Sequence, residues 1–289
     1  MKSARAAHAP AWTLAMSIAA SSLSFIDGSV LNVALPAIRG STGASAAEAQ
    51  WVVNAYALPL AALILLGGAL GDHYGRRLWL VIGTALFAGA SLLCALTSDL
   101  AMLLAGRAVQ GIGAALLLPN SLALLNGAYE GERRGRAVGI WAASGAIAAA
   151  IAPLLGGWLI DRAGWPSIFF INLPIAAAAI LIALTRVAES TERTKARLDF
   201  AGAILATLGL GAATYGLTLW SSDRTFSNTA GIAVVVGIAL MIGFILVERR
   251  LGGRAMIPLD LFGNRCFSSL NLTTFLLYGA FGGAMLLVP

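Results

Sequence analysis

The chain has 289 residues, of which 59% are hydrophobic and only 11% are charged. A soluble domain carries roughly 25% charged residues, so this composition excludes an ordinary soluble protein and predicts a membrane protein. The net charge of +6 does not indicate nucleic-acid binding, because the basic residues lie in short segments between apolar runs rather than on one face or tail.

Nine apolar runs are long enough to cross a membrane, for which roughly 20 mostly apolar residues are needed. The first run follows Lys2 and Arg5 and continues past the usual length of a signal-peptide core, so we interpret it as the first span. In chain order, the predicted spans are 12–35, 51–70, 78–97, 101–126, 137–160, 167–187, 200–220, 229–247 and 267–289.

The basic residues indicate how these spans are oriented. Of the 19 lysines and arginines, Arg39, Arg162 and Arg224 fall in predicted outer segments, Arg107 falls well inside a span, and the other 15 lie in inner segments or at the inner end of a span. Cytoplasmic loops carry an excess of basic residues. The pattern therefore predicts a multi-pass protein whose N-terminus is cytoplasmic.

Two charged residues remain inside spans, Asp27 in the first and Arg107 in the fourth. Burying either charge costs ~2.5–3.5 kcal/mol even on lenient insertion scales, so such residues usually serve a function. Asp27 lies about 13 Å from the outer end of its span and Arg107 about 9 Å into its own, at 1.5 Å per residue. A pair or a shared cavity is geometrically feasible, and a purely structural salt bridge is the alternative. Gln110 shares the Arg107 helix face at i+3.

Residues 68–77, GALGDHYGRR, join the second and third spans and predict a short polar cytoplasmic hairpin. Glycines allow close backbone approach and the loose φ of a tight turn, and arginines mark the cytoplasmic side. Asp72 lies just past the predicted end of a helix, at the negative end of its dipole. We therefore expect an arginine or the N-terminal amides of another helix to compensate it.

The fifth span carries a stripe of small residues interrupted by a proline, which permits close helix packing and a bend. The stripe comprises Gly145, Ala149, Pro153, Gly156 and Gly157. Further along, residues 188–199 are the most polar stretch and predict a cytoplasmic linker. Residues 248–266 mix basic and apolar side chains, as expected of a segment lying along the inner membrane interface.

These motifs, in this order, resemble the major facilitator superfamily, and most closely its fourteen-span drug:proton antiporters. SFIDGSVLNVALPAI, which contains Asp27, is similar to the family's first-helix signature, and GALGDHYGRR to its loop motif. RAVQGIG is similar to the proton-coupling motif and APLLGG to the antiporter motif. LDFAGA and MIPLDLFGNRCF resemble segments around the subfamily's two inserted helices.

The resemblance implies an all-α membrane protein with a major-facilitator-type helical bundle. Its expected organisation is a six-span bundle over residues 1–187, the linker 188–199, two inserted spans over 200–247, the interfacial loop 248–266, and the first helix of an incomplete second bundle over 267–289. The resemblance implies that the protein lies in the plasma membrane of a bacterium, which is also called the inner membrane.

The resemblance also implies a proton-coupled antiporter that exports drugs or other small, mostly apolar compounds. Asp27 and Arg107 would couple transport to protons. Gly68, Asp72, Gly75, Arg76 and Arg77 would form the gating loop, and Gly145, Pro153, Gly156 and Gly157 the antiporter motif. Polar positions that could line the substrate path are Asn32, Asn54, Tyr56, Gln110 and Asn120, some of which could instead link helices.

The expected partners are a small-molecule substrate, protons and the lipid bilayer, with no nucleic acid, no metal and no cofactor beyond the proton gradient. A membrane enzyme has no support, because no His, Cys or carboxylate cluster has catalytic spacing. The last apolar run reaches Pro289 without a polar tail, and full family members have five more spans. We therefore expect a truncated chain, and a non-transporting membrane remnant or interaction subunit is the alternative function.

Overall fold

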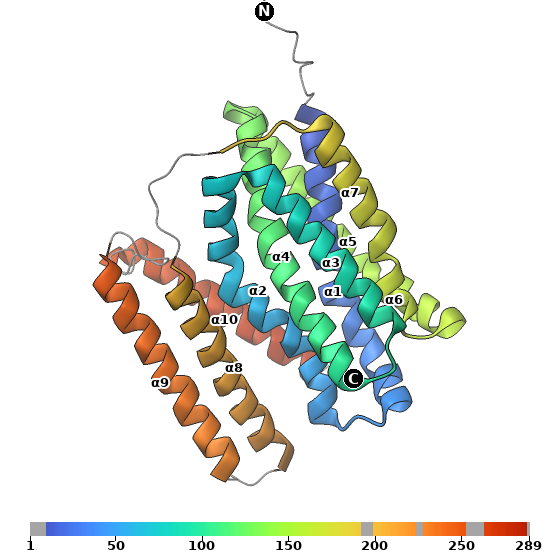
Figure 1. The fold of residues 1–289 in the computed structure, drawn as a ribbon, viewed down its shortest axis with the longest axis vertical. Coiled ribbons are helices and arrows are strands. Elements are labelled where there is room, and N and C mark those ends of the chain that lie inside the picture. The colour runs from blue at the N-terminus through green and yellow to red at the C-terminus, as the bar shows by residue number, and fades with distance from the viewer. Residues whose placement is uncertain (1–9, 192–198, 224–227, 253–262, 288–289) are drawn as a thin grey trace, which may run out of the picture.

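The computed structural model describes residues 10–191, 199–223, 228–252 and 263–287, and this part of the chain consists of helices joined by short connections (Figure 1). The helices are α1 (Pro10–Thr42), α2 (Ala46–Tyr74), α3 (Arg76–Leu96), α4 (Leu100–Ala128), α5 (Gly131–Ala163), α6 (Ser167–Phe170), α7 (Asn172–Arg186), α8 (Phe200–Asp223), α9 (Asn228–Leu251) and α10 (Arg265–Leu287).

Within the described residues, eight helical segments are long and apolar enough to cross a membrane. They are α1 to α5, the segment Ser167–Arg186 made by α6 and α7, residues Ala201–Trp220 of α8, and α9. The ninth predicted span corresponds to α10, whose side chains are largely exposed as far as Leu277. The predicted all-α membrane architecture is confirmed.

Several helices, such as α2 and α4, are longer than the predicted apolar runs because they begin at polar caps outside those runs. Ser45 and Glu48 form a capping box at the start of α2, with the Ser45 amide donating to Glu48 Oε2 at 2.8 Å. At the start of α4, Asp99 Oδ2 accepts a hydrogen bond from the Met102 amide at 2.9 Å. Apolar length therefore reports the membrane-spanning part of a helix and underestimates the whole helix.

Helix α4 lies at the centre of the bundle, packed against α1, α2 and α3, while α1 also packs against α5 and α7 (Figure 1). Close approach is possible because facing positions are glycines. A Cβ at Gly113 of α4 would lie 2.7 Å from the carbonyl oxygen of Gly83 in α3, which is too short for a real contact. The small residues thus allow the backbones of α3 and α4 to touch.

Helices α8 and α9 form a hairpin that packs against α2 beside the bundle (Figure 1). Helix α9 continues to Leu251, so the first residues of the predicted loop 248–266 are helical instead. Residues 253–262 of that loop, and residues 192–198 of the predicted linker 188–199, lie outside the described residues. The division of the chain into domains stays a prediction.

Candidate functional site

The two charges within spans meet inside the bundle. Arg107 Nη1 of α4 lies 2.6 Å from Asp27 Oδ2 of α1. The side chain of Arg107 is 0% exposed and that of Asp27 is 2% exposed. A charge-assisted hydrogen bond of this length, removed from water, is a strong link between the two helices. The ion pair therefore joins α1 to α4.

Arg107 has further partners that do not belong to α1. Its Nε donates to the carbonyl oxygen of Val52 in α2 at 3.0 Å, and its Nη1 donates to Gln110 Oε1 at 2.7 Å. The guanidinium carbon lies 4.5 Å from the ring centroid of Tyr56, also in α2, and 5.9 Å from that of Phe169. Arg107 is thus held by α2 and by its own helix as well as by Asp27.

Gln110 touches both members of the ion pair, because its Nε2 also donates to Asp27 Oδ1 at 3.4 Å, and it extends the network to α3 and α7. Its Nε2 donates to Ser91 Oγ of α3 at 2.7 Å, and Asn172 Nδ2 at the start of α7 donates to the same oxygen at 3.3 Å. The sequence alone did not point to Ser91 or Asn172. Serine is common in membrane helices, and Asn172 is a single amide inside the predicted span 167–187.

The predicted substrate-path residues do not share one surface. Tyr56, Gln110 and Asn120 are buried, whereas Asn32 is exposed and Asn54 is half-buried. Tyr56 shares a hydrogen bond with Ser24, and Gln110 belongs to the Arg107 network. These two residues therefore surround the ion pair.

Asn120 lies elsewhere, between α4 and α2. Its Nδ2 donates to the carbonyl oxygen of Gly67 at 3.0 Å and to that of Leu116, in its own helix, at 2.7 Å. Gly71, one turn after Gly67, faces the same amide, and a Cβ there would collide with it. Asn120 thus links the two helices close to the connection between α2 and α3.

The predicted polar hairpin over residues 68–77 was wrong in its extent. Helix α2 continues to Tyr74 and α3 begins at Arg76, so only Gly75 separates them, with φ +127°. Gly68, Gly71 and Asp72 consequently lie in α2 itself. The turn can be this short because glycine tolerates a positive φ that other residues rarely adopt.

Asp72 lies in the last turn of α2, and an arginine compensates it, as expected. Arg76 donates to Asp72 Oδ1 from Nε at 2.7 Å, and its Nη2 lies 2.7 Å from the same oxygen. The acidic group at the negative end of the helix dipole is thereby neutralised by the first residue of the next helix.

Glu189, which follows α7, was not predicted to belong to this turn. Its Oε1 accepts from the Arg77 amide at 2.9 Å and its Oε2 accepts from the Leu78 amide at 3.1 Å. Arg77 Nη1 donates to the Val187 carbonyl oxygen at 3.0 Å, and the Arg76 amide donates to that of Ser190 at 3.0 Å. The start of the predicted linker is thus bound to the turn.

Helix α5 uses its small residues to pack against α1. A Cβ at Gly145 would lie 2.6 Å from the ring of Phe25, and one at Gly156 would collide with Val30. The adjacent Gly157 has only Val33 near it, at 3.9 Å. Pro153 lies inside the helix between these contacts. Two of the three motif glycines therefore serve the contact with α1.

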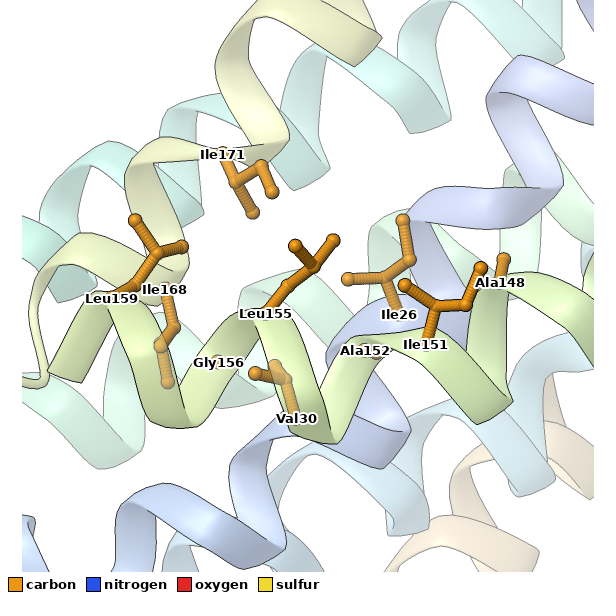
Figure 2. A pocket seen from close by; sticks show the side chains of 10 residues that line it. All are labelled: Ile26, Val30, Ala148, Ile151, Ala152, Leu155, Gly156, Leu159, Ile168 and Ile171. Atoms are coloured by element: carbon orange, nitrogen blue, oxygen red, sulfur yellow. The ribbon is translucent and has the colours of Figure 1, made fainter.

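An apolar cavity of about 110 Å³ lies along the same contact between α1, α5 and the α6 region (Figure 2). Its lining includes Ile26 and Val30 of α1, Ile151 and Leu155 of α5, and Ile168 of α6. Sites for drug-sized ligands usually measure ~300–1,000 Å³. The cavity is therefore too small for a drug-sized ligand, although it lies beside the residue that carries the buried carboxylate.

No group of three or more His, Cys, Asp or Glu side chains in the described ranges is arranged to hold a metal ion.

Comparisons with known proteins match this architecture. Residues 18–289 match the sequence model of the Major Facilitator Superfamily. The chain is 38% identical over 265 residues to the methylenomycin A resistance protein of Bacillus subtilis, covering 91% of this chain and 56% of that protein. It is 37% identical to the multidrug resistance protein Stp of Mycobacterium tuberculosis, covering 91% and 49%. The probable actinorhodin transporter of Streptomyces coelicolor is 33% identical, covering 88% and 45%.

Solved structures of peptide transporters share the fold. A POT peptide transporter in complex with alafosfalin gives a TM-score of 0.60 at 19% identity, covering 82% of this chain and 51% of that chain. The chain spans about half the length of the curated relatives it matches. The family match confirms two predictions: the fold is that of a multi-pass membrane transporter, and the family is one of transporters and not of enzymes. The chain belongs to the Major Facilitator Superfamily.

Proposed function

We propose that this chain is part of a proton-coupled antiporter that exports antibiotics or other small, mostly apolar compounds. The relatives named above are resistance proteins and a probable antibiotic transporter, which supports this substrate class. The observation that carries the proposal is the buried pair of Asp27 and Arg107, which joins two helices through a group that can take up a proton.

The contacts of the pair suggest how a proton would change the structure. When Asp27 is ionised, its attraction for Arg107 holds α1 against α4. A proton on Asp27 removes that attraction, while Arg107 keeps the Val52 carbonyl, Gln110 and the ring of Tyr56. A buried charge without partners is strongly destabilising. The remaining contacts of Arg107 would reduce this free-energy cost when Asp27 separates from it. Protonation would therefore release α1 and leave Arg107 in place.

Movement of α1 would be transmitted to α5, because the two helices touch through Gly145 and Gly156. In this type of transporter, substrate binds near the middle of the membrane and helical bundles rock around it. Asn32 is exposed on α1 and Asn54 is half-buried on α2. We assign these two residues to the substrate path, and Tyr56, Gln110 and Asn120 to the support of the helices.

The proposal includes a plasma-membrane location with the N-terminus in the cytoplasm. The distribution of basic residues supports this orientation. The starts of α3 and α5, which carry Arg76, Arg77, Arg133 and Arg134, would then face the cytoplasm.

Transport measurements on the protein that contains this chain test the proposal. Inverted membrane vesicles with an imposed pH gradient would be assayed for ethidium accumulation. Asp27→Asn should abolish gradient-driven accumulation while protein amounts in the membrane stay normal. Arg107→Lys should also be impaired, because lysine keeps the charge but loses the planar fork that reaches Val52, Asp27 and Gln110 together.

Asp99→Asn is the matched control. It removes a carboxylate at an exposed helix cap, where asparagine caps about as well as aspartate. We expect it to transport normally. Undiminished gradient-driven accumulation in both Asp27→Asn and Arg107→Lys would show that the pair is only a structural salt bridge.

A further inference from the structure

Ser91 of α3 is a junction of three helices beside the ion pair. It is 0% exposed, and its hydroxyl donates to the carbonyl oxygen of Phe87, one turn earlier, at 2.8 Å. Two amide groups reach the same oxygen, Gln110 Nε2 at 2.7 Å and Asn172 Nδ2 at 3.3 Å. Three helices, α3, α4 and α7, therefore meet at this one atom.

The hydrogen bonds of Ser91 favour the same orientation of the Gln110 amide as Arg107 and Asp27 do, with its NH₂ group toward Ser91. A serine hydroxyl has one proton and two lone pairs. Because the proton goes to Phe87, Ser91 can only accept from Gln110, and the amide must present its NH₂ group to Ser91. Its oxygen is then turned toward Arg107, which donates to it at 2.7 Å. A reversed amide would set its NH₂ group against the guanidinium and its oxygen against the Ser91 lone pair.

We infer that Ser91 is a positioning residue for the ion pair and acts through Gln110. This inference rests on the proposed function, in which Arg107 must keep partners after Asp27 takes a proton. Arg107 Nη1 is shared between Asp27 Oδ2 and Gln110 Oε1. The orientation supported by Ser91 supplies the acceptor that Nη1 of Arg107 keeps when the carboxylate is neutralised, beside the Val52 carbonyl that Nε keeps.

Asn172 supports the same arrangement from α7. It donates to the second lone pair of Ser91, so the hydroxyl proton is left with two directions, and turning it toward Gln110 would give up the hydrogen bond to Phe87. The orientation of Gln110 is thereby tied to the backbone of α3 and to the start of α7.

The first test is a thermal-unfolding cycle on the purified protein with Ser91→Ala, Gln110→Leu and the double variant. If Ser91 acts through Gln110, the double variant should have a melting temperature no lower than the lower of the two single variants. Thr84→Val is the matched control. Thr84 is on the same helix, 0% exposed, and donates to its own preceding turn at Leu80. The decrease in melting temperature caused by Thr84→Val should add fully to the decrease caused by Gln110→Leu.

The second test is gradient-driven ethidium accumulation compared with downhill accumulation in the absence of a gradient. Ser91→Ala should lower the gradient-driven rate by about three- to ten-fold, the range expected for one lost oriented hydrogen bond, and leave the downhill rate within about two-fold. Ser91→Thr, which keeps the hydroxyl, should recover coupling. In the Gln110→Leu background, Ser91→Ala should cause no further loss.

The outcomes separate this inference from the proposed function. Additive melting shifts for Ser91→Ala and Gln110→Leu would overturn the inference whatever the transport result. Equal loss of coupling in Thr84→Val, or normal coupling in Ser91→Ala, would also overturn it. Normal gradient-driven transport in Asp27→Asn would instead overturn the proposed function, while the unfolding cycle would still decide whether Ser91 orients Gln110.

Discussion

Glu189 caps the helix in which Arg77 is the second residue, although 112 positions separate them in the sequence. The N-cap position of α3 is Gly75, which has no side chain to satisfy the free amides of the first turn. The Glu189 carboxylate takes that place by accepting from the amides of Arg77 and Leu78. A negative group here also meets the positive end of the helix dipole.

This cap should contribute to the stability of the bundle. Glu189→Ala is expected to destabilise it by about 1 kcal/mol, the usual contribution of a helix cap. The measurement is thermal unfolding in detergent. Glu130→Ala is the control, because Glu130 is the N-cap of α5 but makes no capping hydrogen bond through its side chain. Equal melting temperatures for Glu189→Ala and wild type would show that the cap adds nothing.

Adjacent glycines in α5 should respond in opposite directions to the same change. Gly156→Ala places a methyl group against Val30 of α1 and should destabilise the bundle by about 1–3 kcal/mol, as overpacked contacts do. Gly157→Ala meets only Val33 at 3.9 Å and should be neutral or stabilising by up to about 1 kcal/mol, because alanine is the better helix former. Melting temperatures of the two variants give the comparison. A melting temperature for Gly156→Ala at or above that of Gly157→Ala would contradict the close contact of α1 and α5.

Asn120 should be needed where α2 and α4 touch. Asn120→Ala removes the hydrogen bond to Gly67 and is expected to cost about 1 kcal/mol, near the usual value for polar links between membrane helices. Asn126→Ala, on the same helix but in the lining of an open polar pocket, is the control and should change stability little. Differential scanning fluorimetry can rank the variants. Equal melting temperatures for Asn120→Ala and Asn126→Ala would show that the hydrogen bond from Asn120 to Gly67 does not stabilise the packing of α2 against α4.

The orientation can be tested by cysteine labelling at two exposed connections. In a background with Cys94→Ala and Cys266→Ser, the cytoplasmic orientation of the N-terminus predicts that Ser98→Cys is outside and Glu130→Cys is inside. A membrane-impermeant maleimide should label intact cells only through position 98. Labelling at 130 but not at 98 would reverse the predicted topology.

The sequence by itself determined the helical membrane architecture and the family. Apolar length, basic loops and isolated charges are local properties, and the bilayer imposes the same requirements on every span. For this reason Asp27 and Arg107 could be recognised as unusual, and Gly75 as a glycine that allows a tight turn, without any knowledge of the packing. The extent of the turn could not be read in this way, because a polar stretch does not show where a helix backbone stops.

Only the tertiary structure decided which residues meet. Asp27 and Arg107 lie 80 positions apart, and their contact depends on the packing of α1 against α4. Ser91 and Asn172 are ordinary residues in the sequence and become significant only because α3 and α7 bring them to Gln110. Glu189 likewise gains its role from the return of the chain to the start of α3. The packing of the helices decides which side chains become hydrogen-bond partners. The local sequence pattern around each residue does not show which distant residue it will meet.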